Sequence, residues 1–127
     1  RFFERPMAES VRAGQPTPAA VTASDVLAID EYLMPNPSRT VLIRVKGDSM
    51  IDAGIHPGDV VVVEKCSSAD FGDIVVAVLN NKFTLKRLTR EKGQMVLRPE
   101  NKAYPVIRPK GEFEIFGIVV GQFRKYL

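Results

Sequence analysis

The chain has 127 residues, of which 45% are hydrophobic and 26% are charged, a balance that is ordinary for a globular protein. This length is enough for one domain with a hydrophobic core. The formal charge of +3 is only mildly basic, and no run of Lys and Arg is interleaved with aromatic residues, which argues against a nucleic-acid-binding stripe. No apolar run approaches the roughly 20 residues that cross a bilayer, and no signal peptide is recognisable.

The single cysteine, Cys66, cannot form an internal disulfide, which suits a cytoplasmic protein. The chain begins at Arg1 without an initiator methionine, so we expect a fragment, a processed form or part of a longer chain. No cluster of Cys, His, Asp and Glu has metal-ligand spacing, and no glycine-rich phosphate loop is present. The sequence therefore predicts no metal and no cofactor.

The first part of the chain predicts an extended arm. Residues 1–23 show no sustained period and are rich in Pro and small residues. Residues 24–34 predict one short helix, because Ser24 can cap it and apolar residues recur on a loose face. Asn36-Pro37 follows the expected end of this helix. We therefore expect an N-terminal arm over 1–23 and one domain over 24–127.

The remainder of the chain is typical of strands separated by turns. Asn80-Asn81 predicts a tight hairpin, because Asn tolerates positive φ. Short strands at close spacing indicate a mainly β fold, a compact barrel or sandwich. The expected strands are Val41–Lys46, Val60–Glu64, Asp73–Leu79, Lys82–Thr89, Gln94–Arg98 and Phe113–Val120.

A candidate nucleophile, Ser49, lies in Gly47-Asp48-Ser49-Met50, directly after an apolar strand. A serine there can present its hydroxyl and nearby backbone N–H groups to one substrate carbonyl, but it needs a base to remove its proton. The one histidine, His56, lies in a turn sequence and is more typical of a surface residue. A lysine is therefore the better candidate base, although a Gly-Asp-Ser sequence by itself is usually only a turn.

Lys86 is the lysine that best fits the role of base. It follows the Asn-Asn hairpin within Phe83–Leu88, and alternation places it on the same face as Thr84 and Leu88. Burial among apolar neighbours would lower its pKa by disfavouring the charged form. The local pattern alone is also that of a solvated lysine on a strand.

Taken together, these segments resemble the LexA-like Ser-Lys autopeptidases, a family that includes repressors and the UmuD mutagenesis proteins. Residues 45–59 resemble the family's nucleophile segment and residues 83–88 its general-base strand, at the separation that the resemblance requires. Ala13-Gly14 matches the family's self-cleavage bond. Residues 99–107 and 116–120 are similar to later core segments.

Within the family, the arm is most similar to the UmuD type. Residues 9–19 and 29–38 carry this likeness. Gln15 departs from it, because an aromatic residue is common there in UmuD-like arms.

The resemblance implies a mechanism and a setting. Ser49 Oγ would attack the Ala13 carbonyl, and neutral Lys86 would take the serine proton and then protonate the leaving amine of Gly14. Backbone N–H groups of Asp48 and Ser49 would stabilise the oxyanion. The resemblance also implies a cytoplasmic homodimer, a RecA filament on single-stranded DNA as co-protease in the SOS response to DNA damage, and a product that serves a UmuC-like Y-family translesion polymerase. It implies no direct sequence-specific DNA binding by this chain.

Three alternatives stay open. The same dyad would serve as the C-terminal autopeptidase and dimerisation domain of a LexA-like transcriptional repressor, which would need a helix-turn-helix before Arg1. A signal peptidase would use Ser-Lys chemistry on exported proteins, but it would need a membrane anchor. A non-catalytic β-module for protein binding would tolerate Ser49→Ala.

Overall fold

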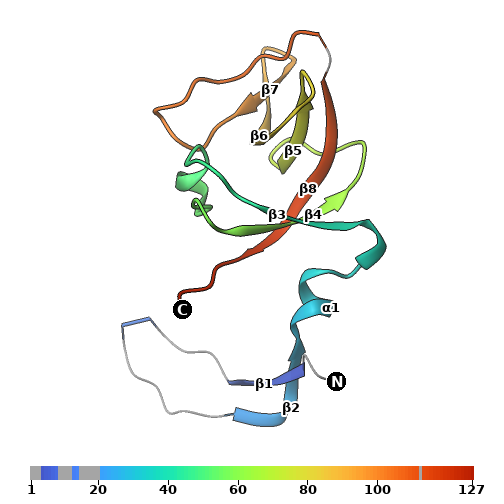
Figure 1. Cartoon of the computed structure of the whole chain (residues 1–127), viewed down its shortest axis with the longest axis vertical. Helices are drawn as coiled ribbons and strands as arrows, with labels where there is room; N and C mark the ends of the chain where they lie inside the picture. The colour runs from blue at the N-terminus through green and yellow to red at the C-terminus, as the bar shows by residue number, and fades with distance from the viewer. Residues whose placement is uncertain (1–3, 9–12, 15–20, 112) are drawn as a thin grey trace. The chain divides into compact units, whose positions relative to one another are not determined.

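The computed structural model describes residues 4–8, 13–14, 21–111 and 113–127, and the chain divides into two compact units, 1–35 and 36–127. In the first unit, β1 (Glu4–Ala8) pairs antiparallel with β2 (Val21–Ala28), which leads directly into α1 (Ile29–Leu33) (Figure 1).

The predicted helix over 24–34 is wrong at its beginning. Residues 24–28 belong to β2, and the helix is limited to Ile29–Leu33 with Ala28, not Ser24, at its N-cap. The reason is long-range pairing, because β1 supplies a ladder partner for each end of β2, from Glu4 opposite Ala28 to Ala8 opposite Val21. Tertiary pairing of this kind overrides a weak helical pattern.

The second unit is a six-stranded antiparallel sheet in the order β3-β4-β8-β5-β6-β7 (Figure 1). Each of its strands falls where the sequence predicts one, so the mainly β fold is confirmed. Two short 3-10 turns, η1 (Pro37–Arg39) and η2 (Ile51–Ala53), lie before and after the first strand. The strands are β3 (Thr40–Arg44), β4 (Val60–Lys65), β5 (Ile74–Leu79), β6 (Lys82–Glu91), β7 (Gln94–Arg98) and β8 (Phe113–Phe123).

The predicted hairpin at Asn80-Asn81 is confirmed. The two residues have φ values of 51° and 65°, and they join β5 to β6 with Leu79 opposite Lys82. Positive φ at both central residues is the geometry of the two-residue turn that matches strand twist. The hairpin fixes the register of β6 and therefore the face on which Lys86 lies.

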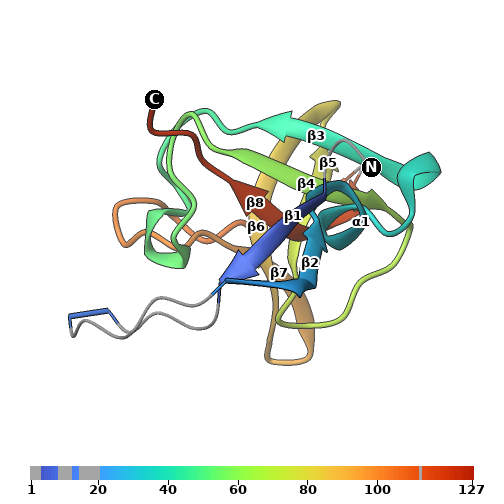
Figure 2. The same cartoon turned by 90° about the horizontal axis from the view of Figure 1, so that it is seen from below.

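β8 belongs to both halves of the sheet. Its first part pairs with β5, and from Gly117 onward it pairs with β4 (Figure 2). Both ladders contain a register shift, which increases local twist. Gly117 is required at this crossing, because a Cβ there would lie 2.6 Å from Val63 Cγ1 and 2.7 Å from the Glu64 carbonyl oxygen.

The bent sheet encloses the main core. Side chains of β3 and β4 pack in one buried cluster with side chains of β5 and β6, although these two pairs of strands are separated by β8 in the sheet order. The sheet is therefore bent so that β3 and β4 fold back toward β5 and β6. A second cluster lies on the other side of β5, under the loop that carries Ile107. The main cluster contains Met50, Ile55, Val61, Val63 and Val76, with Ile43, Leu85 and Phe116 packed against it.

Among the described residues, no helix has the length and apolar character needed to cross a membrane.

Candidate active site

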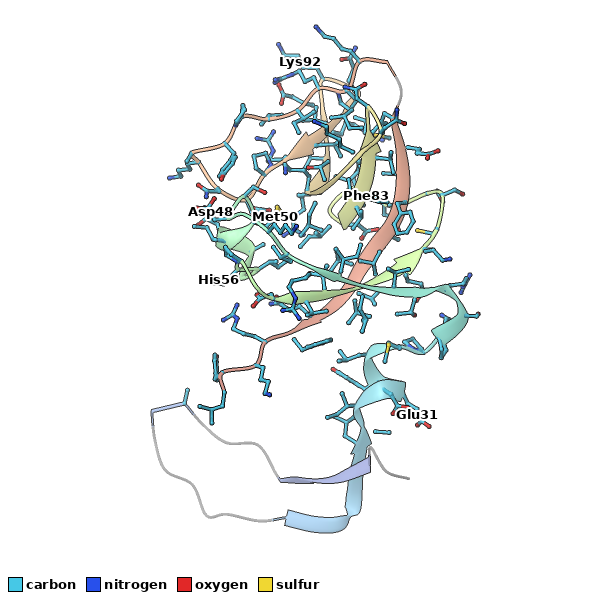
Figure 3. The ribbon with its side chains drawn as sticks, viewed as in Figure 1. Glu31, Asp48, Met50, His56, Phe83 and Lys92 are labelled. Atoms are coloured by element: carbon cyan, nitrogen blue, oxygen red, sulfur yellow. The ribbon has the colours of Figure 1, made fainter. Side chains whose placement is uncertain are left out.

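Ser49 lies in a turn between β3 and η2 that the core holds in place. The next residue, Met50, is buried in the main core cluster, which fixes the backbone on one side of Ser49. On the other side Gly47 has a φ of 77°, a left-handed value that favours glycine. Figure 3 shows Asp48 and Met50 at this turn, with His56 further along the same loop.

Lys86 reaches Ser49 from β6. Its Nζ donates to Ser49 Oγ at 3.2 Å, to Thr84 Oγ1 at 2.9 Å and to the Leu85 carbonyl oxygen at 3.1 Å. The contact with Thr84 agrees with the alternation expected from the sequence. The structure therefore brings together the predicted nucleophile, in the turn after β3, and the predicted base on β6, a strand that is not a neighbour of β3 in the sheet.

Lys86 is buried without a counter-charge. Lys86 is only 8% exposed, and the three hydrogen-bond partners of its Nζ are neutral oxygens. No carboxylate of the described residues forms an ion pair with it. Burial therefore lowers the pKa of Lys86 below its ordinary value, because the charged form loses water. A neutral amine at this distance can accept the proton of Ser49.

Ser49 and Lys86 line a cleft of about 430 Å³. One wall is formed by residues 43–47 at the end of β3, and the other by residues 83–86 of β6. Phe83 stands on the second wall with 64% exposure, and its ring packs edge-on against Phe116 with the centroids 5.1 Å apart. β3 is the terminal strand of the described sheet, so its other edge can pair with an extended peptide.

One of the two predicted oxyanion donors is available. In the part of the chain that the structure describes, the backbone N–H groups of Ser49 and Met50 donate to no protein acceptor, whereas the Asp48 N–H faces the Tyr104 hydroxyl. Unused donors beside a nucleophile are the requirement for stabilising a developing oxyanion.

The predicted cleavage bond belongs to the other unit. Ala13 and Gly14 form a bend and both are exposed. Gly14 has a φ of 95°, which an L residue rarely adopts. Gln15 and the other neighbours, 9–12 and 15–20, lie outside the described residues.

His56 is exposed in its loop, as the sequence predicts. Its backbone N–H donates to Asp59 Oδ2 at 2.8 Å. Within the described ranges, no group of His, Cys, Asp and Glu side chains is arranged to hold a metal ion.

Sequence reasoning missed the segment that holds Ser49. The Glu100 N–H donates to the Ser49 carbonyl oxygen at 2.8 Å. Asn101 Nδ2 donates to the Asp48 carbonyl oxygen at 2.8 Å, and the Tyr104 hydroxyl donates to the Asp48 carboxylate. No local pattern predicts these contacts. The only sequence signal was the resemblance of residues 99–107 to a later core segment of the family.

Comparison with known proteins assigns the chain to a family. The family model described as Peptidase S24-like matches residues 6–120. The chain belongs to the Peptidase S24-like family. Ser49, Lys86, both walls of the cleft and the Ala13-Gly14 bond all lie inside the matched region.

Several relatives are similar to this S24-like chain. The LexA repressor of Clostridium kluyveri is 39% identical over 125 residues, which cover 98% of this chain and 61% of the repressor. The LexA repressor of Geotalea uraniireducens is 45% identical over 122 residues, covering 94% and 60%. Protein SamA of Salmonella typhimurium is 40% identical over 117 residues, covering 92% and 82%. The chain thus spans about 60% of the length of these LexA repressors.

Proposed function

We propose that this chain is a self-cleaving serine peptidase that cuts its own Ala13-Gly14 bond, with Ser49 as nucleophile and Lys86 as general base. The observation that carries the proposal is the 3.2 Å contact between Lys86 Nζ and Ser49 Oγ, made by a lysine buried without a counter-charge. A free lysine has a pKa of about 10.4 and is almost fully charged at neutral pH. Burial is what makes this one a usable base.

The reaction follows from the contacts around Lys86. Neutral Nζ takes the Ser49 proton as Oγ attacks the Ala13 carbonyl carbon. The N–H groups of Asp48 and Ser49 stabilise the oxyanion. Collapse of the tetrahedral intermediate breaks the bond to Gly14, and Lys86 gives its proton to the leaving amine. A water molecule, deprotonated by Lys86, then releases Ser49 from the Ala13 ester.

The proposed substrate fits the cleft in size and form. Ala13 and Gly14 are small and exposed, so this bond can approach Ser49 without a bulky side chain. The free edge of β3 suits an extended peptide. Because the protein carries its own substrate, the entropy of association is largely paid in advance. Regulated cleavage then depends on how often the arm reaches the cleft.

We also propose a cytoplasmic role in the SOS response to DNA damage. In this role a RecA filament on single-stranded DNA promotes cleavage, and the shortened product serves a UmuC-like Y-family translesion polymerase. Support comes from the family membership and from the likeness of residues 9–19 and 29–38 to UmuD-type arms.

A second candidate is the C-terminal autopeptidase and dimerisation domain of a LexA-like repressor. The identities of 39% and 45% to LexA repressors favour it. The chemistry would be the same in both cases. The sequence encoded before Arg1 decides between them, because a repressor needs a helix-turn-helix reader there.

In either role we propose that the chain forms a homodimer. Val120 and Phe123 are exposed apolar residues on β8, and a second copy would cover them. Sedimentation equilibrium at micromolar concentration should show a dimer, and a pure monomer would contradict this part of the proposal.

Self-cleavage is tested by the mass and N-terminal sequence of the product. After incubation at alkaline pH, or with RecA filaments, the shorter product should begin Gly14-Gln15-Pro16. Ser49→Ala should stay intact under the same conditions. A product that begins elsewhere, or a wild-type chain that stays uncut in every condition, would refute the assignment.

A further inference from the structure

Residues 100–104 contact the nucleophile turn at three points, and we name this segment the clamp. Two contacts hold consecutive carbonyl groups, because the Glu100 N–H donates to the Ser49 oxygen and Asn101 Nδ2 donates to the Asp48 oxygen, each at 2.8 Å. The third joins the Tyr104 hydroxyl to the Asp48 carboxylate. No other described segment outside the turn's own loop donates hydrogen bonds to residues 48 and 49 except β6 through Lys86.

The clamp is itself held in one conformation. Asn101 Oδ1 accepts the Ala103 N–H at 2.9 Å, so the amide of Asn101 is oriented with its nitrogen toward Asp48. Glu100 Oε1 accepts from Arg87 Nε at 2.8 Å. Arg87 is the residue after Lys86 on β6, so one strand positions both the base and the segment that holds the nucleophile.

These contacts fix the direction of the unused donors. A peptide unit is planar, with its C=O and the following N–H on opposite sides. When the clamp binds the carbonyl oxygens of Asp48 and Ser49, the N–H groups of Ser49 and Met50 must turn away from the clamp. The same contacts restrict the backbone of Ser49 and therefore where Oγ meets Lys86.

We propose that Asn101 and Tyr104 are positioning residues, which act through the Asp48-Ser49 backbone to aim the nucleophile and the Ser49 N–H, one of its two proposed oxyanion donors. The inference rests on the proposed self-cleavage for its meaning, but the contacts that support it are separate from the Ser49–Lys86 contact. Neither side chain touches the reacting atoms.

Tyr104→Phe is the decisive variant, because it removes one hydroxyl from a side chain that is 41% exposed and leaves the core unchanged. We expect self-cleavage to slow about tenfold, less than the roughly 10²–10³-fold loss when an oxyanion donor itself is removed. Tyr126→Phe is the matched control, since it removes the same atom from an exposed tyrosine of the C-terminal segment, and its rate should equal the wild-type rate.

Asn101→Asp tests the second contact. The carboxylate can still accept the Ala103 N–H, but it has no donor for the Asp48 carbonyl oxygen. We expect a loss of about 10²-fold, the size that follows from a small misplacement of a catalytic group.

The dependence of rate on pH separates positioning from other causes. If the clamp acts only by orienting the nucleophile turn, Tyr104→Phe lowers the plateau rate and leaves the midpoint of the pH profile unchanged, because Lys86 keeps its surroundings.

Asp48→Asn keeps an acceptor for Tyr104 and should restore most of the rate that Asp48→Ala loses. The double variant Asp48→Ala/Tyr104→Phe should be no slower than Asp48→Ala alone, because both remove the same interaction.

The proposal is overturned if Tyr104→Phe cleaves within twofold of the wild-type plateau rate, or if its profile shifts in midpoint. Additive losses in the double variant would also overturn it. If the wild-type chain does not cleave at all, the proposed function fails first. The clamp is then judged by the amide NMR signals of Ser49 and Met50, which Tyr104→Phe should shift if the clamp orients them, and unchanged signals refute it.

Discussion

Two charged side chains are buried among the described residues, and they differ in their partners. Asp59, 1% exposed, accepts hydrogen bonds from Arg124 at 2.6 and 2.8 Å and from the His56 N–H at 2.8 Å. Lys86 meets only neutral oxygens. One buried charge is thus compensated and the other is not.

The pKa values of Asp59 and Lys86 are both lowered, but this favours the charged form of Asp59 and the neutral form of Lys86. The hydrogen bonds from Arg124 lower the pKa of Asp59 to about 2, which keeps the carboxylate charged. Burial lowers the pKa of Lys86, which favours the neutral amine. A compensated buried charge stays ionised, whereas an uncompensated one is typical of a group poised for proton transfer.

The compensated pair closes the loop that follows Ser49. Arg124 Nη2 donates to the Gly54 carbonyl oxygen at 3.1 Å, and Gln122 Nε2 donates to the same atom at 3.0 Å. Asp59 is therefore the centre of a contact between the C-terminal segment and the loop from η2 to β4. Its role is to hold the scaffold, while Lys86 carries out the proposed chemistry.

The largest expected effect comes from removing the uncompensated charge. Lys86→Ala should abolish self-cleavage at every pH, because loss of a general base costs about 10²–10⁴-fold in rate. Lys86→Arg should also be inactive, since a guanidinium stays charged. The appearance of the Gly14 product on a denaturing gel measures the rate. Cleavage by Lys86→Ala would show that another group is the base.

The next effect concerns pH. The wild-type rate should rise about tenfold per pH unit while Lys86 is mostly charged and then flatten near its lowered pKa, because only the neutral amine accepts a proton. Arg124→Gln should leave the midpoint of this profile unchanged, since Asp59 and Arg124 do not contact Lys86. A flat wild-type profile would exclude a titrating base.

The strands could be predicted from the sequence, and Ser49 and Lys86 could be chosen as candidates, because both have local signals. The alternation of side chains along a strand placed Lys86 on the same face as Thr84, and the Asn80-Asn81 hairpin fixed the register of β6. The pairing of Ser49 with Lys86 across the cleft came from family resemblance, since no local pattern reports which distant segment meets another.

What the sequence did not reveal depends on long-range contacts. Arg124 lies 65 positions from Asp59, and Tyr104 lies 56 positions from Asp48. Single charged or phenolic side chains in such segments carry no periodicity. The misplaced start of the helix at residues 24–28 has the same origin, because the partner strand β1 decided that segment.

A smaller effect tests the compensated pair through stability. In a Ser49→Ala background, which removes cleavage, Arg124→Gln should lower the Tm by several degrees. Asp59→Asn should lower it less. The reason is asymmetry, because losing Arg124 leaves a buried carboxylate unpaired, whereas losing Asp59 frees a guanidinium that is already 37% exposed. Equal losses would contradict this asymmetry, because they would mean that the unpaired buried carboxylate adds no cost beyond the lost interaction.

The Asp59–Arg124 pair also predicts how the stability of the protein falls in acid. The folded pKa of Asp59 is about 2, below the unfolded value of about 3.9, so its contribution to stability is present above about pH 4 and is lost as pH falls toward 2. Urea unfolding should therefore show the difference between the background protein and Asp59→Asn shrinking over this range. Glu91, whose pKa is also lowered by Arg108, is common to both proteins and cancels in the difference.

The smallest expected effect is a gain in stability from Lys86→Met, again in the Ser49→Ala background. The folded pKa of Lys86 is lowered, so below it the folded protein bears the full cost of a buried ammonium. As pH rises from that pKa toward the unfolded value of about 10.4, the folded state loses its proton first and the background protein with Lys86 becomes more stable.

Lys86→Met should therefore have the higher Tm at pH 7, by a few degrees, and this advantage should shrink by pH 10. Lys82→Met, at an exposed position of the same strand, should show no such dependence. A destabilised Lys86→Met at pH 7, or a difference that does not change with pH, would mean that the buried lysine is not under electrostatic strain.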